Sequence, residues 1–266
     1  MHVGSSAYHP LVVPVALEGC ACRAAFHVGV TSWMVGRGLT PPVVAGASSG
    51  ALVGAVWAVG RVPELREAWL EMAGTARVFE PRRLLRGRWP GRMSHLLRDR
   101  LDEYGHLRMS DVPALRVAIT RLGLRGPRRV VLDARSDVSV VDAVLASCFI
   151  PGPYSRPVVV GRRFAVDGAW FERVPVGALP VGRAIAVVSD PRGRIVGGWP
   201  RERTLPVSAD VRVLAPLEPL PLSGFDFDGP GTRAAIAIGE ASAEAFVRAN
   251  ERWMTAPHAG VGEWYT

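Results

Sequence analysis

A serine among very small residues is the part of this sequence best suited to covalent chemistry. Gly46-Ala47-Ser48-Ser49-Gly50 fits the pattern G-x-S-x-G and lies between a predicted strand, Pro42–Ala45, and a predicted helix, Ser49–Val59. In that context a serine occupies a tight, strained turn with its hydroxyl exposed, and small neighbours prevent clashes. The following helix would also point its free N–H groups at the site. The pattern predicts that Ser48 is a nucleophile for acyl chemistry.

A serine nucleophile needs a base, and histidine is the usual one. The chain has six histidines: His2, His9, His27, His95, His106 and His258. Only His258 falls late enough for the Ser, Asp, His order of an α/β-hydrolase. That fold normally places several strands before its nucleophile, whereas one convincing strand, Val12–Leu17, precedes Ser48. A triad through His258 therefore stays open as the alternative to a base of another type.

Four segments, in order along the chain, resemble the motifs of patatin-like phospholipases. Residues 17–30 resemble the family's glycine-rich oxyanion segment, G-G-G-x-R-G, and the small–aromatic–His–x–Gly helix that follows it. The G-x-S-x-G match comes next, at the family's spacing. Residues 146–152 resemble A-S-x-A-I-P-G, and residues 166–169 resemble D-G-[GA]. The resemblance covers about Val12 to Val176.

The resemblance implies a Ser–Asp dyad, with Ser48 as nucleophile and Asp167 as base. It also implies an oxyanion hole made by the backbone of Gly19, Cys20 and Ala21, which Arg23 braces. His27 then becomes a structural residue on its helix, and Gly168 allows a sharp turn after the carboxylate. An ordinary carboxylate is a weak base, so the dyad requires a dry site that raises the pKa of Asp167.

The sequence departs from the family within the oxyanion segment. Cys20 and Ala21 replace two glycines of G-G-G, and Ala24 replaces the last glycine. A residue with a Cβ resists positive φ by about 1 kcal/mol or more. We therefore expect an oxyanion hole of different shape, with altered activity as one consequence.

Alternating apolar and helical segments predict an α/β fold with a mostly parallel central sheet, helices on both faces, and one domain over residues 1–266. Besides the segments above, further strands are predicted at 116–120, 129–132, 157–160, 164–166, 184–189 and 210–214. Further helices are predicted at 23–38, 63–73, 93–101, 140–147 and 232–253. The uncharged run Val43–Val59 is nearly long enough to span a bilayer, but its glycines favour a strand, a turn and a buried helix.

The chain carries a net charge of +8, and all 32 basic residues are arginine. Seven arginines and one acid, Asp99, fall within Pro81–Arg100, with Trp89 and several leucines interleaved. This stretch is either a solvated helix pair or a basic cap that meets an anionic membrane. No groove-reading motif indicates nucleic acid. No signal peptide is evident at the N-terminus, so we expect a cytoplasmic protein, peripheral at a membrane if the cap binds lipid.

Three functions fit these features. The first is hydrolysis of carboxylic esters in phospholipids or lysophospholipids. The second is acyl transfer, in which another acceptor replaces water at the acyl-enzyme. The third is non-catalytic lipid binding, which the altered oxyanion segment would permit. No cofactor is expected, and no metal either, because no Asp cluster resembles a Ca²⁺ loop.

Overall fold

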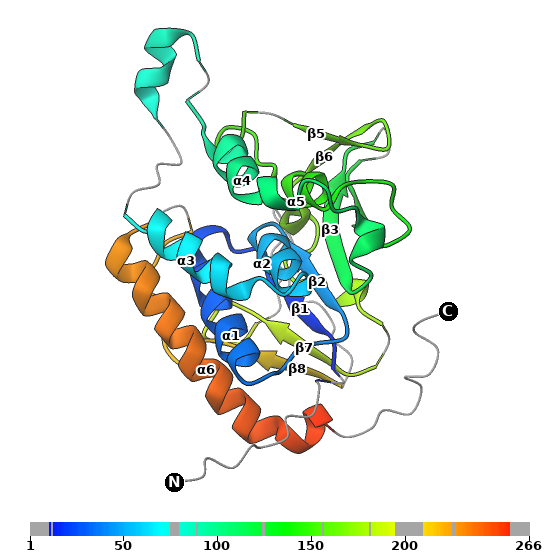
Figure 1. Ribbon diagram of the computed structural model, residues 1–266, viewed down its shortest axis with the longest axis vertical. Helices are drawn as coiled ribbons and strands as arrows, with labels where there is room; N and C mark the ends of the chain where they lie inside the picture. Colours follow the sequence, from blue (N-terminus) through cyan, green and yellow to red (C-terminus); the bar gives the residue numbers. More distant parts are fainter. Residues whose placement is uncertain are drawn as a thin grey trace.

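The computed structural model of the protein describes residues 11, 13–74, 80–88, 90–123, 126–155, 157–180, 182–194, 210–224 and 227–255. Within them an eight-stranded sheet forms the centre of the molecule (Figure 1), with strands β1 (Val15–Leu17), β2 (Val44–Ala47), β3 (Leu115–Arg121), β4 (Arg128–Leu132), β5 (Val158–Val160), β6 (Arg163–Val166), β7 (Ala184–Val187) and β8 (Val211–Leu214). The α-helices are α1 (Ala25–Gly36), α2 (Ser49–Ala58), α3 (Val62–Met72), α4 (Met93–Leu101), α5 (Val140–Cys148) and α6 (Gly229–Thr255).

The strand order is β5-β6-β3-β2-β1-β7-β8, and β4 also pairs with β3. The five strands from β3 to β8 in this order run parallel to one another. The strands β4 and β6 run antiparallel to β3, and β5 runs antiparallel to β6. The predicted mostly parallel sheet flanked by helices is therefore confirmed, with an antiparallel edge at one side.

Strand register brings three distant segments of chain to one edge of the sheet. Leu17 pairs with Gly46 in the parallel β1–β2 pair, so the ends of both strands lie side by side. Ala47 pairs with Ala118 of β3. The antiparallel pairing of Thr120 with Val166 then carries the end of β6 back toward Ala118. The residues that follow β1, β2 and β6 consequently meet at the same place.

The two faces of the sheet are covered unequally. Val15 and Leu17 belong to a large apolar cluster to which all six α-helices contribute, whereas Ala16 belongs to a smaller cluster on the opposite face. Among the described residues, that second face is covered by Val174–Leu179, which includes the 3₁₀-helix η6 (Val176–Ala178). Helix α2 lies at the centre of the larger cluster and is buried on every side from Ser49 to Trp57. A helix that is apolar all round belongs in such a position.

The predicted elements are all present, with shifted ends. The second strand begins at Val44 and runs to Ala47, so it delivers the chain directly to Ser48. The predicted helix at 23–38 is split, because a 3₁₀-helix, η1 (Ala21–Ala24), precedes α1. Residues 43–59 form the expected strand, turn and buried helix. No helix in the described part of the chain combines the length and apolarity that crossing a bilayer requires.

The arginine-rich stretch Pro81–Arg100 divides into two unlike parts. Its second part is α4, which packs on α5 and buries Ser94 and Leu97. Its first part is a 3₁₀-helix, η2 (Pro81–Arg86), which projects from the body of the molecule (Figure 1). Trp89 lies outside the described residues. Only residues 80–88 therefore fit the description of an exposed basic cap; we call them the basic projection.

Helices α1 and α6 approach each other through a glycine on each. A Cβ at Gly29 would overlap the carbonyl oxygen of Ile236, and a Cβ at Gly239 would overlap that of Phe26. Both helices lie along one side of the molecule (Figure 1), with their backbones in contact at this crossing. Small residues at these two positions set the distance between the helices.

We predict that Gly29→Ala or Gly239→Ala lowers the free energy of unfolding by about 1–3 kcal/mol, because the added methyl must push the helices apart. Urea denaturation measures the change. Gly36→Ala is the matched control, since a Cβ there meets no atom within 4 Å; alanine in a helix should leave stability equal or raise it by up to about 1 kcal/mol. Equal effects at Gly29 and Gly36 would contradict this account of the crossing.

Candidate active site

Ser48 lies in the turn between β2 and α2, as predicted, with φ 51° and ψ −128°. Positive φ in a residue with a Cβ is strained and is often found at functional sites. The neighbouring glycines make the turn possible. A Cβ at Gly46 would lie 2.5 Å from the amide nitrogen of Ala51, and one at Gly50 would lie 2.6 Å from the carbonyl oxygen of Glu18. The small residues of the motif therefore let the turn pack tightly against the end of β1.

Asp167 follows β6 directly and lies against Ser48. The Ser48 hydroxyl donates a 2.6 Å hydrogen bond to Oδ2 of Asp167, and the amide of Ala169 donates one of 2.8 Å to Oδ1. Both side chains are buried, with Asp167 5% exposed. Gly168 contributes differently from expectation: its φ is not positive, but a Cβ there would overlap the carbonyl oxygen of Ala118. Close packing on β3, not a sharp turn, requires glycine at this position.

The pKa of Asp167 is raised from 3.8 to about 7. Burial is the cause, because a dry environment disfavours the charged carboxylate. The hydrogen bonds from Ser48 and Ala169 lower the pKa and only partly offset burial. The site thus gives a carboxylate the proton affinity that a general base needs near neutral pH.

Ser147 holds the Ser48 turn in place, a role that the motif comparison did not assign. Its hydroxyl oxygen accepts a 2.8 Å hydrogen bond from the amide of Ser48 and donates one of 2.6 Å to the carbonyl oxygen of Ala118. The side chain is completely buried. One hydroxyl therefore ties α5, β3 and the strained turn together. The signal was present in the sequence, since Ser147 stands in the segment that resembles A-S-x-A-I-P-G.

Two of the three amides of the expected oxyanion segment have a hydrogen-bond acceptor among the described residues. Gly19 donates to the carbonyl oxygen of Arg173 over 2.8 Å, and Cys20 donates to the hydroxyl of Ser49 over 3.1 Å. The amide of Ala21 has no acceptor among the described residues. Gly19 is required for space, because a Cβ would lie 2.5 Å from that of Ala169 and 3.0 Å from that of Ser48.

Ala21 adopts φ 51° although it carries a side chain. This is one of the positions where the family has glycine. The chain therefore keeps the left-handed backbone at a cost of about 1–2 kcal/mol. Surrounding contacts must hold it there.

An ion pair provides part of that support and was not predicted. Glu18 is buried, pairs with Arg173 over 2.8 Å through Oε1, and accepts a 2.5 Å hydrogen bond from the amide of Ser189 at Oε2. Because the carbonyl of Arg173 also accepts from Gly19, the pair fixes the start of the oxyanion segment at two points. Arg23, expected to brace this segment, is exposed and reaches the carbonyl oxygen of Leu222 with its Nε at 3.4 Å.

Side-chain atoms of Glu18, Cys20 and His27 lie within 4.8 Å of one another, which is close enough to suggest a metal site. The chemistry is unfavourable for a cation, because both Glu18 oxygens already have partners and one of these is the Arg173 guanidinium. Burial lowers the pKa of His27 to about 3 and raises that of the Cys20 thiol well above its usual range. Both are therefore neutral packing residues, with His27 Nε2 3.8 Å from Cys20 Sγ.

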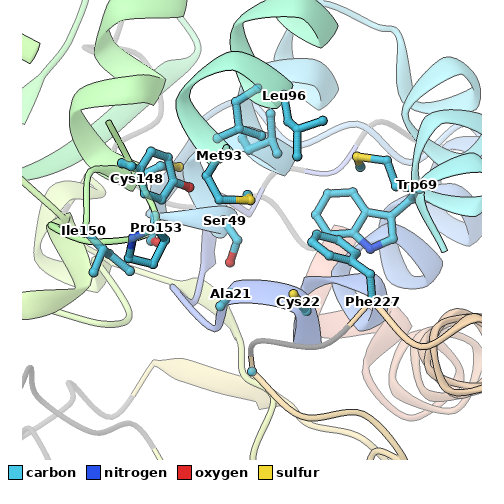
Figure 2. Close-up of a pocket in the computed structure, with 16 residues that line it drawn as sticks. Ala21, Cys22, Ser49, Trp69, Met93, Leu96, Cys148, Ile150, Pro153 and Phe227 are labelled. Atoms are coloured by element: carbon cyan, nitrogen blue, oxygen red, sulfur yellow. The ribbon is translucent and has the colours of Figure 1, made fainter. Parts of the chain in front are cut away.

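Two cavities meet at Ser48. One, which we call the apolar pocket, has a volume of about 60 Å³ (Figure 2), and it is lined by Ala21, Cys22, Ser48, Ser49, Leu52, Trp69, Met72, Met93, Leu96, Leu97, Cys148, Ile150, Pro153, Tyr154, Gly224 and Phe227. The other, the open hollow, is larger at about 640 Å³ and is lined by Gly19, Cys20, Ala21, Arg23, Ser48, Ile150, Asp167, Ala169, Trp170, Arg173 and Gly224. No histidine lines either cavity among the described residues, and His258 lies outside them.

Asp167→Asn should stabilise the protein at high pH. The folded-state pKa lies above the unfolded value, so the destabilising effect of the charged carboxylate develops as pH rises from about 3.8 to about 7. Thermal unfolding should show a higher Tm for the variant at pH 8 and no such gain near pH 4.

Asp190→Asn is a control for which we expect the opposite change in Tm. Burial raises the pKa of Asp190. Hydrogen bonds from the Arg192 amide and the Arg194 side chain, together with the positive charge of Arg194, outweigh burial and hold that pKa below its usual value. That substitution should lower Tm at pH 8. A lower Tm for Asp167→Asn at pH 8 would contradict the raised pKa.

The fold resembles several solved structures at low sequence identity. ExoU, a type III effector protein from Pseudomonas aeruginosa, matches with a TM-score of 0.51 and 16% identity over 91% of this chain and 54% of its own. VipD from Legionella pneumophila matches with a TM-score of 0.47 and 12% identity, over 88% of this chain and 67% of its own. This chain therefore spans about half the length of ExoU.

Comparison with models of protein families identifies the family of the chain. The model described as patatin-like phospholipase matches residues 15–180, which is more than half of the chain. The matched range holds the strained serine turn, the buried aspartate and the oxyanion segment. The chain belongs to the patatin-like phospholipase family.

Proposed function

We propose that the protein hydrolyses carboxylic esters of lipids, with Ser48 as nucleophile and Asp167 as general base. The observation that carries this proposal is the 2.6 Å hydrogen bond between the two side chains at the junction of two cavities. A hydroxyl becomes nucleophilic when a base within hydrogen-bond reach accepts its proton. The raised pKa of Asp167 suits that task.

The first proton transfer follows the hydrogen bond that already joins Ser48 to Asp167. Ser48 Oγ attacks the ester carbonyl carbon while its proton passes to Asp167 Oδ2. The tetrahedral intermediate collapses, the C–O bond to the alcohol breaks, and Asp167 returns the proton to the leaving alcohol. A water molecule then attacks the acyl-enzyme, gives its proton to Asp167, and releases the carboxylic acid as the Ser48 hydroxyl is restored.

The developing oxyanion would be held by backbone amides. The Ala21 amide is the first candidate, since Ala21 lines both cavities and its amide has no acceptor among the described residues. The Cys20 amide is the second, and it becomes available when the Ser49 hydroxyl rotates away. The Gly19 amide contributes by anchoring the segment to Arg173. The N-terminus of α2 adds a favourable dipole at the same place.

The two cavities favour a phospholipid or lysophospholipid as substrate. The apolar pocket suits an acyl chain, because nearly all of its lining side chains are apolar. The open hollow is lined by Arg23 and Arg173, and guanidinium groups bind phosphate well. An ester at Ser48 would then have its acyl chain on one side and its phosphate on the other.

The basic projection is proposed to contact an anionic membrane. Leu84 is 60% exposed and Leu85 88% exposed, between the exposed arginines Arg82, Arg86 and Arg88. Apolar side chains can enter the lipid interface while arginines neutralise head groups. Because α4 is packed on the molecule, we restrict the membrane contact from Pro81–Arg100 to residues 80–88.

Ser48→Ala should lower release of fatty acid from phospholipid vesicles by about 10⁴-fold or more and abolish labelling by a fluorophosphonate, because the attacking oxygen is gone. Product analysis by mass spectrometry measures release. Ser110→Ala removes the same atom at an exposed site and should leave the rate unchanged.

Labelling of Ser48 without product release would favour a lipid-binding role. A new ester formed when glycerol is added would favour acyl transfer. Activity retained by Ser48→Ala or by Asp167→Asn would contradict the dyad.

Replacing Arg82, Arg86 and Arg88 together by Gln should weaken binding to phosphatidylserine vesicles by about tenfold or more at low salt, and the difference should shrink as salt rises. Vesicle sedimentation measures binding. The same three positions changed to Lys keep the charge and should bind nearly as well as wild type. Equal binding by the Gln variant would show that the basic projection is only a solvated surface.

A further inference from the structure

The apolar pocket is elongated, and Trp69 stands at one of its ends. Figure 2 shows Cys148, Ile150 and Pro153 at one end, Trp69 and Phe227 at the other, and Met93 and Leu96 of α4 across the pocket. The Ser48 amide donates a hydrogen bond to Ser147, the residue before Cys148 (Figure 2), so Ser48 lies toward the end opposite Trp69. A chain attached to Ser48 that follows the pocket therefore runs toward the indole.

A second cavity begins on the far side of Trp69. It has a volume of about 220 Å³ and lies between α2, α3 and α4. Four side chains line both cavities: Leu52, Trp69, Met72 and Leu97. We call these four residues the partition. It is thin, because the same side chains form the wall of each cavity.

Trp69 is the largest member of the partition, and no hydrogen bond from a described residue fixes it. Its side chain is 2% exposed, and the buried indole Nε1 has no hydrogen-bond partner among the described residues. The ring packs against Phe227 with a centroid separation of 6.2 Å. Its neighbour Met72 has a flexible side chain that adapts to different shapes. The indole thus closes the pocket by volume alone, which a smaller side chain would not do.

We infer that the partition sets the acyl-chain length that the enzyme accepts, with Trp69 as the specificity-determining residue. This inference rests on the proposed function. The apolar pocket of about 60 Å³ takes the first part of the chain. The second cavity of about 220 Å³ would take the rest once the partition opens, along its buried apolar residues Val56, Leu65 and Leu101. Four charged residues of that cavity are exposed and leave this path apolar: Glu67, Glu71, Arg100 and Glu103. Each methylene that gains apolar contact adds to binding, whereas one that meets the indole does not.

Binding of saturated fatty acids, from butyrate to palmitate, tests the partition without catalysis. The Ser48→Ala protein and its Trp69→Leu derivative would be titrated by calorimetry. Affinity should rise about fourfold for each added methylene that finds apolar contact, and then stop rising at the length that fills the pocket. Trp69→Leu should move that limit to longer chains. Leucine keeps the site apolar, and thermal unfolding confirms that the variant is folded.

Hydrolysis of p-nitrophenyl esters, from acetate to palmitate, provides the catalytic readout. Relative to wild type, Trp69→Leu should raise the ratio of kcat/KM for palmitate over butyrate by about tenfold or more. Trp57→Leu is the matched control: Trp57 is equally buried on α2 but lines neither cavity, so its length profile should not change.

Different outcomes would contradict the role of the partition and the proposed function. The same length limit in the fatty acid titrations of both proteins would overturn the role of the partition, whether or not esters are hydrolysed. A shifted limit with no hydrolysis of any ester would uphold the partition and overturn the proposed function. A shift caused equally by Trp57→Leu would also overturn the inference, since that residue lines neither cavity.

Discussion

The contact between Ser48 and Asp167 is the interaction on which the rest of the site depends. It joins residues 119 positions apart through a 2.6 Å hydrogen bond inside a dry environment. Burial disfavours the carboxylate's charge and thereby raises its proton affinity. The same burial costs stability above neutral pH. Asp167, the proposed base, is thus a group whose neutral, protonated form costs the folded protein less stability than its charged form.

The strained serine turn and the proposed oxyanion segment are held by neighbours to which we assign no step of the reaction. Ser147 fixes the Ser48 amide, while the Glu18–Arg173 pair and the carbonyl of Arg173 fix the start of the oxyanion segment. With these anchors the chain tolerates a left-handed backbone at Ala21, where the family has glycine. The altered segment therefore keeps the left-handed backbone conformation that glycine would allow. The hydrogen bonds and the ion pair that anchor its neighbours account for this.

The two cavities make one side of the site apolar and the other side basic. An apolar pocket and an arginine-lined hollow meet at Ser48, so the amphipathic ester that we propose as substrate would have one preferred orientation. The helices α2, α3 and α4 enclose the apolar side, and the ends of β1 and β6 border the hollow. The packing of α4 on α5 also explains why only residues 80–88 project (Figure 1). Helix α4 thus lines the apolar pocket and directly follows the basic projection in the chain.

Local sequence by itself determined the strands and helices and the serine turn between β2 and α2, because apolar periodicity and small residues report on local backbone needs. The pairing of Ser48 with Asp167 came from the resemblance of four ordered motifs to the patatin-like family. It also indicated that Ala21 stands where glycine is usual. It did not indicate that Gly168 is needed for packing on Ala118, that Gly19 donates to Arg173, or that Glu18 is buried in an ion pair. Nor did it show that Trp69 separates two cavities. Those features arise between segments distant in the chain, where strand register and helix packing, not local pattern, decide which atoms meet.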